Sequence, residues 1–204
     1  MQVHTKKPRK HRRRHHHFIA AWIRSPLKVG SLLPSSRGLA RAMAAQVDVE
    51  RPGAVVELGA GTGAVTHALV QAGISAQKLV IIEREQKLHA LMCAQFPQLN
   101  VLCADAAELE KTLAHIHVKT VNAVVSSLPL LSMQKQVRDA IVQQMAQVIG
   151  KEGIIVQFTY GPRSPITPGQ MRKYHLHGKR AKLVVANMPP AHVWVYRKGN
   201  ERGN

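Results

Sequence analysis

From residue 54 onward, short apolar runs alternate with segments that have helical spacing. The apolar runs are 54–58, 78–83, 100–104, 121–126 and 153–159. The helix-like segments are 65–72, 85–95, 106–115 and 133–148. Nearly continuous apolar runs are typical of parallel strands that are covered on both faces. The pattern therefore predicts an α/β protein with a doubly wound, mostly parallel sheet.

The last third of the chain departs from this alternation. Two more strands are predicted at 181–186 and 192–197, and the pair Pro189-Pro190 predicts a turn between them instead of a helix. Five alternating units followed by such a hairpin predict a seven-stranded Rossmann-like sheet whose last strand is antiparallel.

The segment before residue 48 has a different pattern. Phe18, Ile19, Trp22 and Ile23 form one apolar face of a short helix, beside basic residues. That composition is typical of a helix lying in the plane of a membrane surface, although docking on the protein's own core is the alternative. Ser36 is placed to cap a second helix at 37–46. We predict a disordered basic tail at 1–17, membrane-surface helices at 18–47 and a catalytic domain at 48–204.

Charge is distributed unevenly along the 204 residues, whose formal net charge is +18. Residues 1–47 contain 11 Lys or Arg and no acid, whereas residues 48–160 contain 9 against 10 acids. Residues 161–204 again contain 9 Lys or Arg, against one acid. Basic ends around a nearly neutral centre indicate an anionic partner, either a membrane surface or a nucleic acid. Arg12, Arg13 and Arg14 are among the tail residues expected to contact anionic lipid.

The cysteines and the hydropathy of the chain indicate the cellular compartment in which the protein is expected. Cys93 and Cys103 have no metal-like spacing, and two cysteines suggest no disulfide framework, so a reducing compartment is expected. The chain contains no apolar run of the length that spans a bilayer. We expect a cytoplasmic protein, peripheral on the inner face of the cell membrane, with no metal site, the histidines at 15–17 included.

The strongest local motif follows the first apolar run and reads Glu57-Leu-Gly-Ala-Gly-Thr-Gly63. A buried strand that enters a glycine-rich turn and then a helix brings backbone N–H groups close to a ligand. The spacing is G-x-G-x-G with an acid two residues ahead, unlike the dinucleotide fingerprint G-x-G-x-x-G. It is the form used by S-adenosylmethionine-dependent methyltransferases, and it assigns Glu57, Gly59, Ala60, Gly61 and Gly63 to the cofactor.

Acids at the ends of the next two strands complete this set. Glu83 ends the second strand and is expected to accept from both ribose hydroxyls. Asp105 ends the third strand and is expected to accept from the adenine amine. Further cofactor contacts are expected from neighbouring residues and from a loop before the second helix. They are Arg84, Ala106, Ser126, Gly30 and Ser31.

The ends of strands four and five bear on the substrate. Enzymes that methylate the adenine amine usually have Asn or Asp, then Pro, then an aromatic residue after strand four. Ser127 occupies the Asn place here, and Leu130 the aromatic place, so the pocket lacks a stacking face for a base. After strand five come Tyr160, whose ring attracts ammonium groups, and Arg163, which suits phosphate.

These features together resemble the small bacterial phospholipid N-methyltransferases, over roughly residues 18–166. Beyond the glycine motif, the stretches Ser126-Ser-Leu-Pro-Leu-Leu131 and Gln157-Phe-Thr-Tyr-Gly161 carry the resemblance. It implies class I S-adenosylmethionine chemistry on phosphatidylethanolamine and its methylated products, towards phosphatidylcholine, with no obligatory nucleic acid. The family is similar in fold to rRNA adenine dimethylases. The long basic tail and a poorly matching final third leave another amino lipid, such as ornithine lipid, open.

The predicted mechanism is in-line attack by a neutral amine, for which orientation matters more than proton transfer. We expect Tyr160 to orient the amine and backbone carbonyls near Ser127 and Leu128 to accept its hydrogens. Arg163, Lys173 and Tyr174 are expected to hold the phosphate. The rival hypotheses are an RNA adenine methyltransferase and a non-catalytic binding relic. The complete set of cofactor residues argues against the relic.

Overall fold

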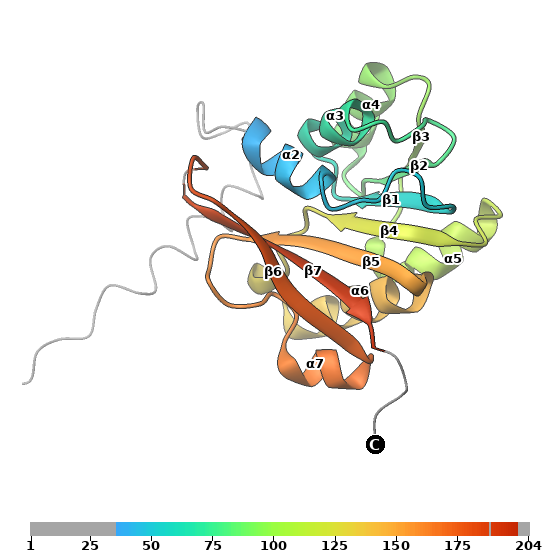
Figure 1. Ribbon diagram of the computed structural model, residues 1–204. Coiled ribbons are helices and arrows are strands. Elements are labelled where there is room, and N and C mark those ends of the chain that lie inside the picture. Colours follow the sequence, from blue (N-terminus) through green and yellow to red (C-terminus); the bar gives the residue numbers. More distant parts are fainter. Residues whose placement is uncertain (1–35, 188, 200–204) are drawn as a thin grey trace, which may run out of the picture. The chain divides into compact units, whose positions relative to one another are not determined.

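The computed structural model describes residues 36–187 and 189–199. All of these residues belong to one compact unit. Its centre is a seven-stranded sheet of order β3-β2-β1-β4-β5-β7-β6 (Figure 1). The strands are β1 (Ala54–Leu58), β2 (Leu79–Ile82), β3 (Asn100–Leu102), β4 (Val121–Ser126), β5 (Ile149–Thr159), β6 (Leu176–Val184) and β7 (Ala191–Lys198).

Strands β1 to β5 pair in parallel, whereas β7 runs antiparallel to both β5 and β6. The predicted doubly wound sheet with an antiparallel last strand is therefore confirmed. Because β7 inserts between β5 and β6, β6 becomes the outer strand of that side.

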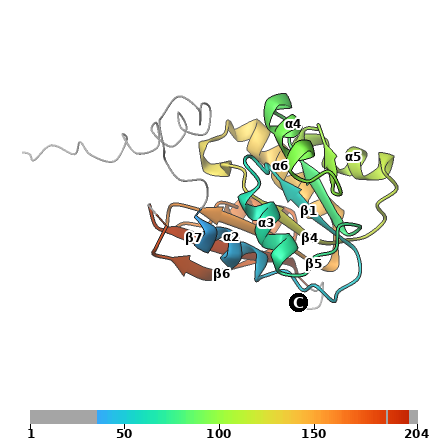
Figure 2. The same ribbon diagram turned by 90° about the horizontal axis from the view of Figure 1, so that it is seen from above.

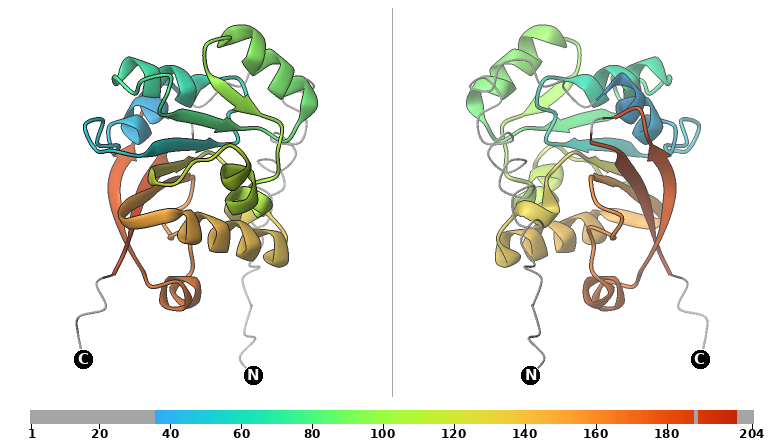
Figure 3. Two further views of the ribbon diagram at one scale, coloured as in Figure 1. Left: turned by 90° about the vertical axis from the view of Figure 1, so that its right-hand side faces the viewer. Right: turned by 90° about the vertical axis from the view of Figure 1, so that its left-hand side faces the viewer.

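Helices cover both faces of the sheet (Figures 2 and 3). One core cluster joins one face to α2 (Arg37–Ala44), α3 (Ala64–Gln71) and α4 (Gln86–Gln95). The other joins the opposite face to α5 (Leu109–His115), α6 (Lys135–Val148) and α7 (Pro168–Lys173). Neighbouring strand residues alternate between the clusters, as Val55 and Val56 do. Burial on both faces explains why the strand runs are almost continuously apolar.

The domain begins earlier than predicted. The Ser36 hydroxyl accepts from the Leu39 N–H at 3.2 Å, which confirms the predicted helix cap. Leu39 and Met43 of α2 are fully buried in the first core cluster. The predicted boundary at residue 48 thus falls inside the compact unit, because α2 is part of its core. The predicted tail and the helix at 18–28 lie outside the described residues.

Two elements near the end of the chain differ from the prediction. Strand β6 begins at Leu176 instead of residue 181, because its first half is polar and mostly exposed at the sheet edge and shows no alternation. Helix α7 was not predicted. A capping box of Thr167 and Gln170, with Pro168 in its first turn, marks its start and was readable in the sequence.

The strand register brings the functional stretches to one edge. Leu58 of β1 lies opposite Ile82 of β2 and Ser126 of β4, and Ser126 lies opposite Gln157 of β5. The carboxyl ends of these parallel strands therefore open on the same edge of the sheet, where open α/β sheets bind ligands.

Candidate active site

The glycine turn after β1 is shaped by close neighbours on two sides and by open space in the middle. A β-carbon at Gly59 would lie 2.7 Å from Leu128 Cδ2, and one at Gly63 would lie 2.8 Å from Phe96 Cε2. A β-carbon at Gly61 would meet no atom of the described residues within 4 Å, and the φ angle of 57° is one that side chains disfavour. Gly59 and Gly63 thus permit packing, whereas Gly61 leaves its backbone open to a ligand.

Glu57 lies beneath this turn and is completely buried. Its Oε2 accepts from the Thr66 hydroxyl at 2.7 Å, whereas its buried Oε1 has no hydrogen-bond partner among the described residues. Burial raises the pKa of Glu57 to about 7, partly offset by the Thr66 hydrogen bond. A buried acceptor without a donor is the kind of group that a ligand's cationic or N–H group satisfies.

Glu83 follows β2 and is also buried. Its Oε2 accepts from the Gly61 N–H at 3.0 Å, and its Oε1 accepts from the Glu85 N–H at 3.0 Å. The carboxylate therefore holds the glycine turn in place. Each oxygen keeps a second acceptor direction, so Glu83 still suits a pair of ribose hydroxyls.

Asp105 follows β3 and links two neighbouring segments. Its Oδ1 accepts from the Ala107 N–H at 2.9 Å and so caps the 3₁₀ turn Ala106–Glu108. Its Oδ2 bonds the Arg84 guanidinium at 3.1 Å. Arg84 thus reaches Asp105, and Ala106 is buried at the start of the turn. An adenine amine would have to share Asp105 with these two donors.

The turn fits the expected cofactor. An open backbone at Gly61, an acceptor pair at Glu83 and an unpaired oxygen at Glu57 match an adenosine sulfonium with ribose hydroxyls and an ammonium group. The predicted residues Gly30 and Ser31 lie outside the described residues.

A side chain of β5 hydrogen-bonds the loop after β4 and supports it. Gln157 is completely buried, and its Nε2 donates to the Leu128 carbonyl at 2.9 Å. The Leu130 N–H donates to the same carbonyl at 2.9 Å. Both lone pairs of the Leu128 carbonyl oxygen are therefore occupied. The prediction that this carbonyl accepts hydrogens from the substrate amine is corrected. Ser127 lies beside it, and its buried Oγ has no partner among the described residues.

Gln157 is a functional candidate that sequence reasoning did not single out. Its Oε1 is buried and unpartnered within the described structure, as is Nε1 of Trp194, which lies opposite Gln157 on β7. The signal was a polar side chain inside the apolar run that begins at Ile154. Only the pairing of β5 with β4 and β7 shows that this side chain supports the Ser127–Leu128 loop.

Tyr160 lies at the end of β5 but packs on the face covered by α2 and α3. Its ring meets Phe158 edge-on at 5.3 Å between centroids. Burial raises the pKa of its phenol, and a hydrogen bond with the Asn187 side chain partly offsets that effect. No hydrogen bond in the described part of the chain joins Tyr160 to Ser127 or Leu128.

The predicted phosphate residues do not come together. Arg163 is exposed in the loop after β5, on the carboxyl edge. Lys173 and Tyr174 end α7 just before β6, whose first residue, Leu176, pairs beyond the amino end of the β5–β7 ladder. Their assignment to the carboxyl-edge site is corrected, because the connection through the unpredicted helix α7 returns the chain to the amino edge before β6 begins. Lys173 instead lies over the Tyr174 ring at 5.0 Å.

The membrane residues predicted in the tail and first helix lie outside the described residues. They are Phe18, Ile19, Trp22, Ile23, Arg12, Arg13 and Arg14. Within 36–187 and 189–199, no helix is long and apolar enough to cross a bilayer.

Known proteins resemble this chain in sequence and in fold. No protein-family model matches the chain. An ornithine lipid N-methyltransferase of Singulisphaera acidiphila is 27% identical over 148 residues, covering 71% of this chain and 77% of that protein.

Three solved methyltransferases share the fold at low identity. The magnesium protoporphyrin IX methyltransferase of Synechocystis PCC 6803, solved with S-adenosylmethionine, has a TM-score of 0.61 at 13% identity, covering 90% of this chain and 97% of its own. A glycopeptide N-methyltransferase, also solved with the cofactor, has a TM-score of 0.62 at 11% identity, covering 83% and 96%. A TehB-like enzyme of Corynebacterium glutamicum has a TM-score of 0.59 at 17% identity, covering 91% and 98%. The chain therefore has the class I fold of S-adenosylmethionine-dependent methyltransferases, and the predicted cofactor is the one these neighbours use.

Proposed function

We propose that this protein transfers methyl groups from S-adenosylmethionine to the head-group amine of an amino lipid at an anionic membrane surface. It would act on the cytoplasmic face of the cell membrane, without a metal or an obligatory nucleic acid. Phosphatidylethanolamine is the substrate predicted from the sequence, and ornithine lipid is the substrate of the curated relative. Both lipids present a primary amine near an anionic group.

The observation that carries the proposal is the meeting of two loops at one sheet edge. The Gly59 turn, with its acids Glu57 and Glu83, packs directly against Leu128 of the loop after β4. At Ser127 that loop has a buried hydroxyl with no partner among the described residues, and the buried amide of Gln157 on β5 supports the loop from the neighbouring strand. A cofactor turn next to unpaired polar groups supports methyl transfer to a polar, hydrogen-bonding acceptor.

Leu130 weighs against a nucleobase substrate. Its side chain is only 1% exposed and packs in the second core cluster. It therefore offers no surface on which a flipped base can stack, which is a principal part of base recognition.

S-adenosylmethionine, when bound, supplies an electrophilic methyl group to the amine nitrogen. The residues of this chain have to orient the amine and favour its neutral form, because an ammonium has no lone pair. Half-buried surroundings at Tyr160 disfavour a charged ammonium by desolvation. Ser127 Oγ and the Tyr160 ring would orient the amine, and Arg163 would bind the neighbouring phosphate or carboxylate.

The decisive experiment incubates the full chain with radiolabelled S-adenosylmethionine and anionic vesicles that contain phosphatidylethanolamine or ornithine lipid, beside a tube of ribosomal RNA. Label in the organic phase supports the proposal, and the vesicle that is labelled identifies the head group. Label in RNA alone would refute it. A Tyr160→Ala variant with full turnover would remove Tyr160 from the site while leaving the lipid assignment intact.

A further inference from the structure

We propose that the turn end of the β6–β7 hairpin docks on the anionic bilayer and so presents lipid head groups to the active site. The docking surface is defined as Lys179, Arg180, Lys182, Leu183 and Val185. This inference rests on the proposed function, since it explains how a lipid reaches the carboxyl edge.

The hairpin end exposes apolar side chains that the core does not use. Val185 is 70% exposed and Leu183 is 45% exposed, the two highest values among the exposed large hydrophobic residues of the described chain. Pro189 and Pro190 of the same turn are exposed as well. Apolar side chains at a projecting turn, with basic side chains beside them, have the composition that inserts shallowly into a bilayer interface.

The charge beside these residues is entirely positive. Lys179, Arg180 and Lys182 are exposed on β6, and no Asp or Glu occurs among the described residues from 153 to 199. None of the three takes part in an ion pair within the described part of the chain. Unpaired basic side chains next to an apolar tip match a negatively charged leaflet.

The position of the hairpin connects this surface to the site. Leu183 lies opposite His192, and His192 lies opposite Thr159, one residue before Tyr160. The turn therefore extends past the end of β5 on the carboxyl edge (Figure 1). A bilayer that contacts Val185 would therefore meet the same edge of the sheet that carries Tyr160 and Arg163.

Hydrogen bonds of Asn187 hold the turn between β6 and β7 in place. Asn187 is buried, its Nδ2 donates to the Pro189 carbonyl at 2.8 Å, and its Oδ1 accepts from the Ser36 N–H at 3.1 Å. A turn that is bonded internally and to the start of α2 keeps its exposed apolar residues in one orientation, as a docking surface requires.

Neither protection of the sheet edge nor binding of nucleic acid accounts for the whole of this surface. Lysines on an edge strand discourage pairing with another sheet, but exposed Leu183 and Val185 do the opposite. A nucleic-acid surface needs basic side chains, but an aliphatic tip provides no stacking face for bases. A lipid bilayer matches both the charge and the apolar side chains.

The first test measures contact directly. Cys93 and Cys103 are both exposed, so they are replaced by serine and an environment-sensitive fluorophore is attached to Val185→Cys. Vesicles of phosphatidylcholine with phosphatidylglycerol should shift its emission to the blue. The matched control is Val70→Cys near the end of α3, away from the carboxyl edge, which is 40% exposed and should not shift. An unshifted probe at 185 on vesicle-bound protein would overturn the proposal.

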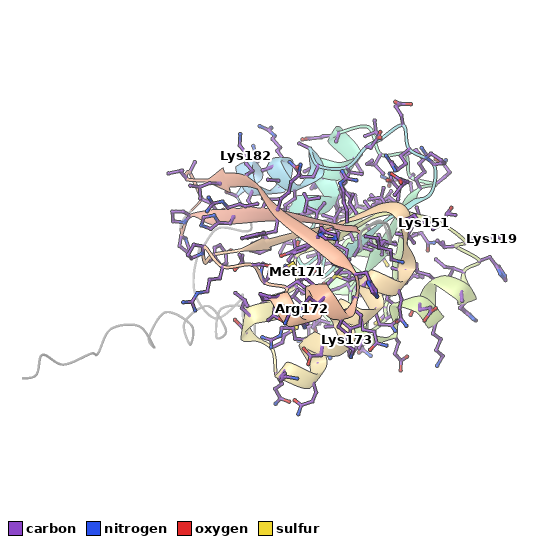
Figure 4. The ribbon with its side chains drawn as sticks, turned by 60° about the horizontal axis from the view of Figure 1, so that its bottom comes forward. Lys119, Lys151, Met171, Arg172, Lys173 and Lys182 are labelled. Carbon is purple, nitrogen blue, oxygen red and sulfur yellow. The ribbon has the colours of Figure 1, made fainter. Side chains whose placement is uncertain are left out.

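The second test removes the charge. Lys179→Gln, Arg180→Gln and Lys182→Gln together should weaken vesicle binding about 10- to 100-fold, since each basic side chain near an anionic leaflet contributes. The control changes Lys119, Lys151 and Arg197 to glutamine, because these exposed residues lie toward the amino edge of the sheet. Lys119 lies far from Lys182 in Figure 4, at the amino edge of the sheet just before β4. Equal losses in both variants would indicate net charge alone and would refute the surface.

The outcomes separate this proposal from the proposed function. If the hairpin variants bind vesicles as the wild type does while lipid is still labelled, the docking surface is wrong and the enzyme assignment stands. If the hairpin contacts vesicles but no lipid is ever labelled, the substrate assignment is wrong and the docking surface stands. Weaker RNA binding without weaker vesicle binding would assign the surface to nucleic acid and overturn the proposal.

Discussion

The carboxyl edge of the sheet has two halves that differ in how their polar groups are satisfied. In the half built by β1 to β3, Glu83 and Asp105 already accept hydrogen bonds from the surrounding chain, and only Glu57 Oε1 is unpaired among the described residues. In the half built by β4, β5 and β7, several buried polar atoms have no partner within the described structure. They are Ser127 Oγ, Gln157 Oε1, Trp194 Nε1 and His192 Nδ1. The polar groups of the first half are therefore held in position by the chain itself. Those of the second half are of the kind that hydrogen-bond a substrate or ordered water.

The largest effect should come from closing the open backbone of the first half. Gly61→Ala places a methyl group where no atom of the described residues lies within 4 Å, so it should weaken S-adenosylmethionine binding about 100-fold. Gly73 also has a positive φ and open space, and it lies outside the turn. Gly73→Ala therefore has a similar backbone cost and should leave affinity unchanged in calorimetry. Equal affinities for the two variants would exclude Gly61 from the cofactor site.

A second prediction uses the pKa of Glu57. The pKa of Glu57 in the folded state, about 7, lies above the ordinary value of 4.5. Between these two pH values the folded state keeps the proton on Glu57, whereas the unfolded state has lost it. The free energy of unfolding is therefore highest below pH 4.5 and falls as pH rises from 4.5 through 7, by about 3 kcal/mol. Glu57→Gln should remove this decline, so that denaturant unfolding at pH 8 shows a variant more stable than wild type. Parallel pH profiles for the two proteins would contradict this prediction.

In the second half, Gln157→Ala should reduce turnover about 10-fold while cofactor affinity changes less than about threefold. Loss of the bond to the Leu128 carbonyl frees the loop and costs about 1–3 kcal/mol of stability. The control is Gln144→Ala on α6, a half-buried glutamine that accepts from the Glu110 N–H and donates to the Gln147 side chain. Turnover measured beside thermal unfolding separates loop positioning from general destabilisation. A turnover loss matched by the same loss of cofactor affinity would mean that Gln157 acts on the first half as well.

The smallest effect is expected at the residues that the structure removes from the site. Lys173→Gln and Tyr174→Phe should each change KM for lipid less than about twofold, because both lie by the amino end of the β5–β7 ladder. Arg163→Gln serves as the comparison and should raise KM about 10-fold, as expected for one lost charge-assisted contact. A large effect at Lys173 with none at Arg163 would reverse this placement.

What the sequence determined by itself is mostly local. Strand β1, the glycine turn and the following helix were predicted almost to the residue, because strand, turn and helix signals lie side by side in one stretch. The acids at Glu57, Glu83 and Asp105 were placed correctly at strand ends for the same reason.

Only the tertiary structure decided the remainder. The support of Leu128 by Gln157, 29 residues away, depends on strand pairing that no local pattern contains. The same is true of the place of β7 between β5 and β6, and of the connection from β5 to β6 that carries Lys173 and Tyr174 away from the site. Contacts between distant segments are set by the shared burial of many side chains, so they follow from the folded sheet and not from any single motif.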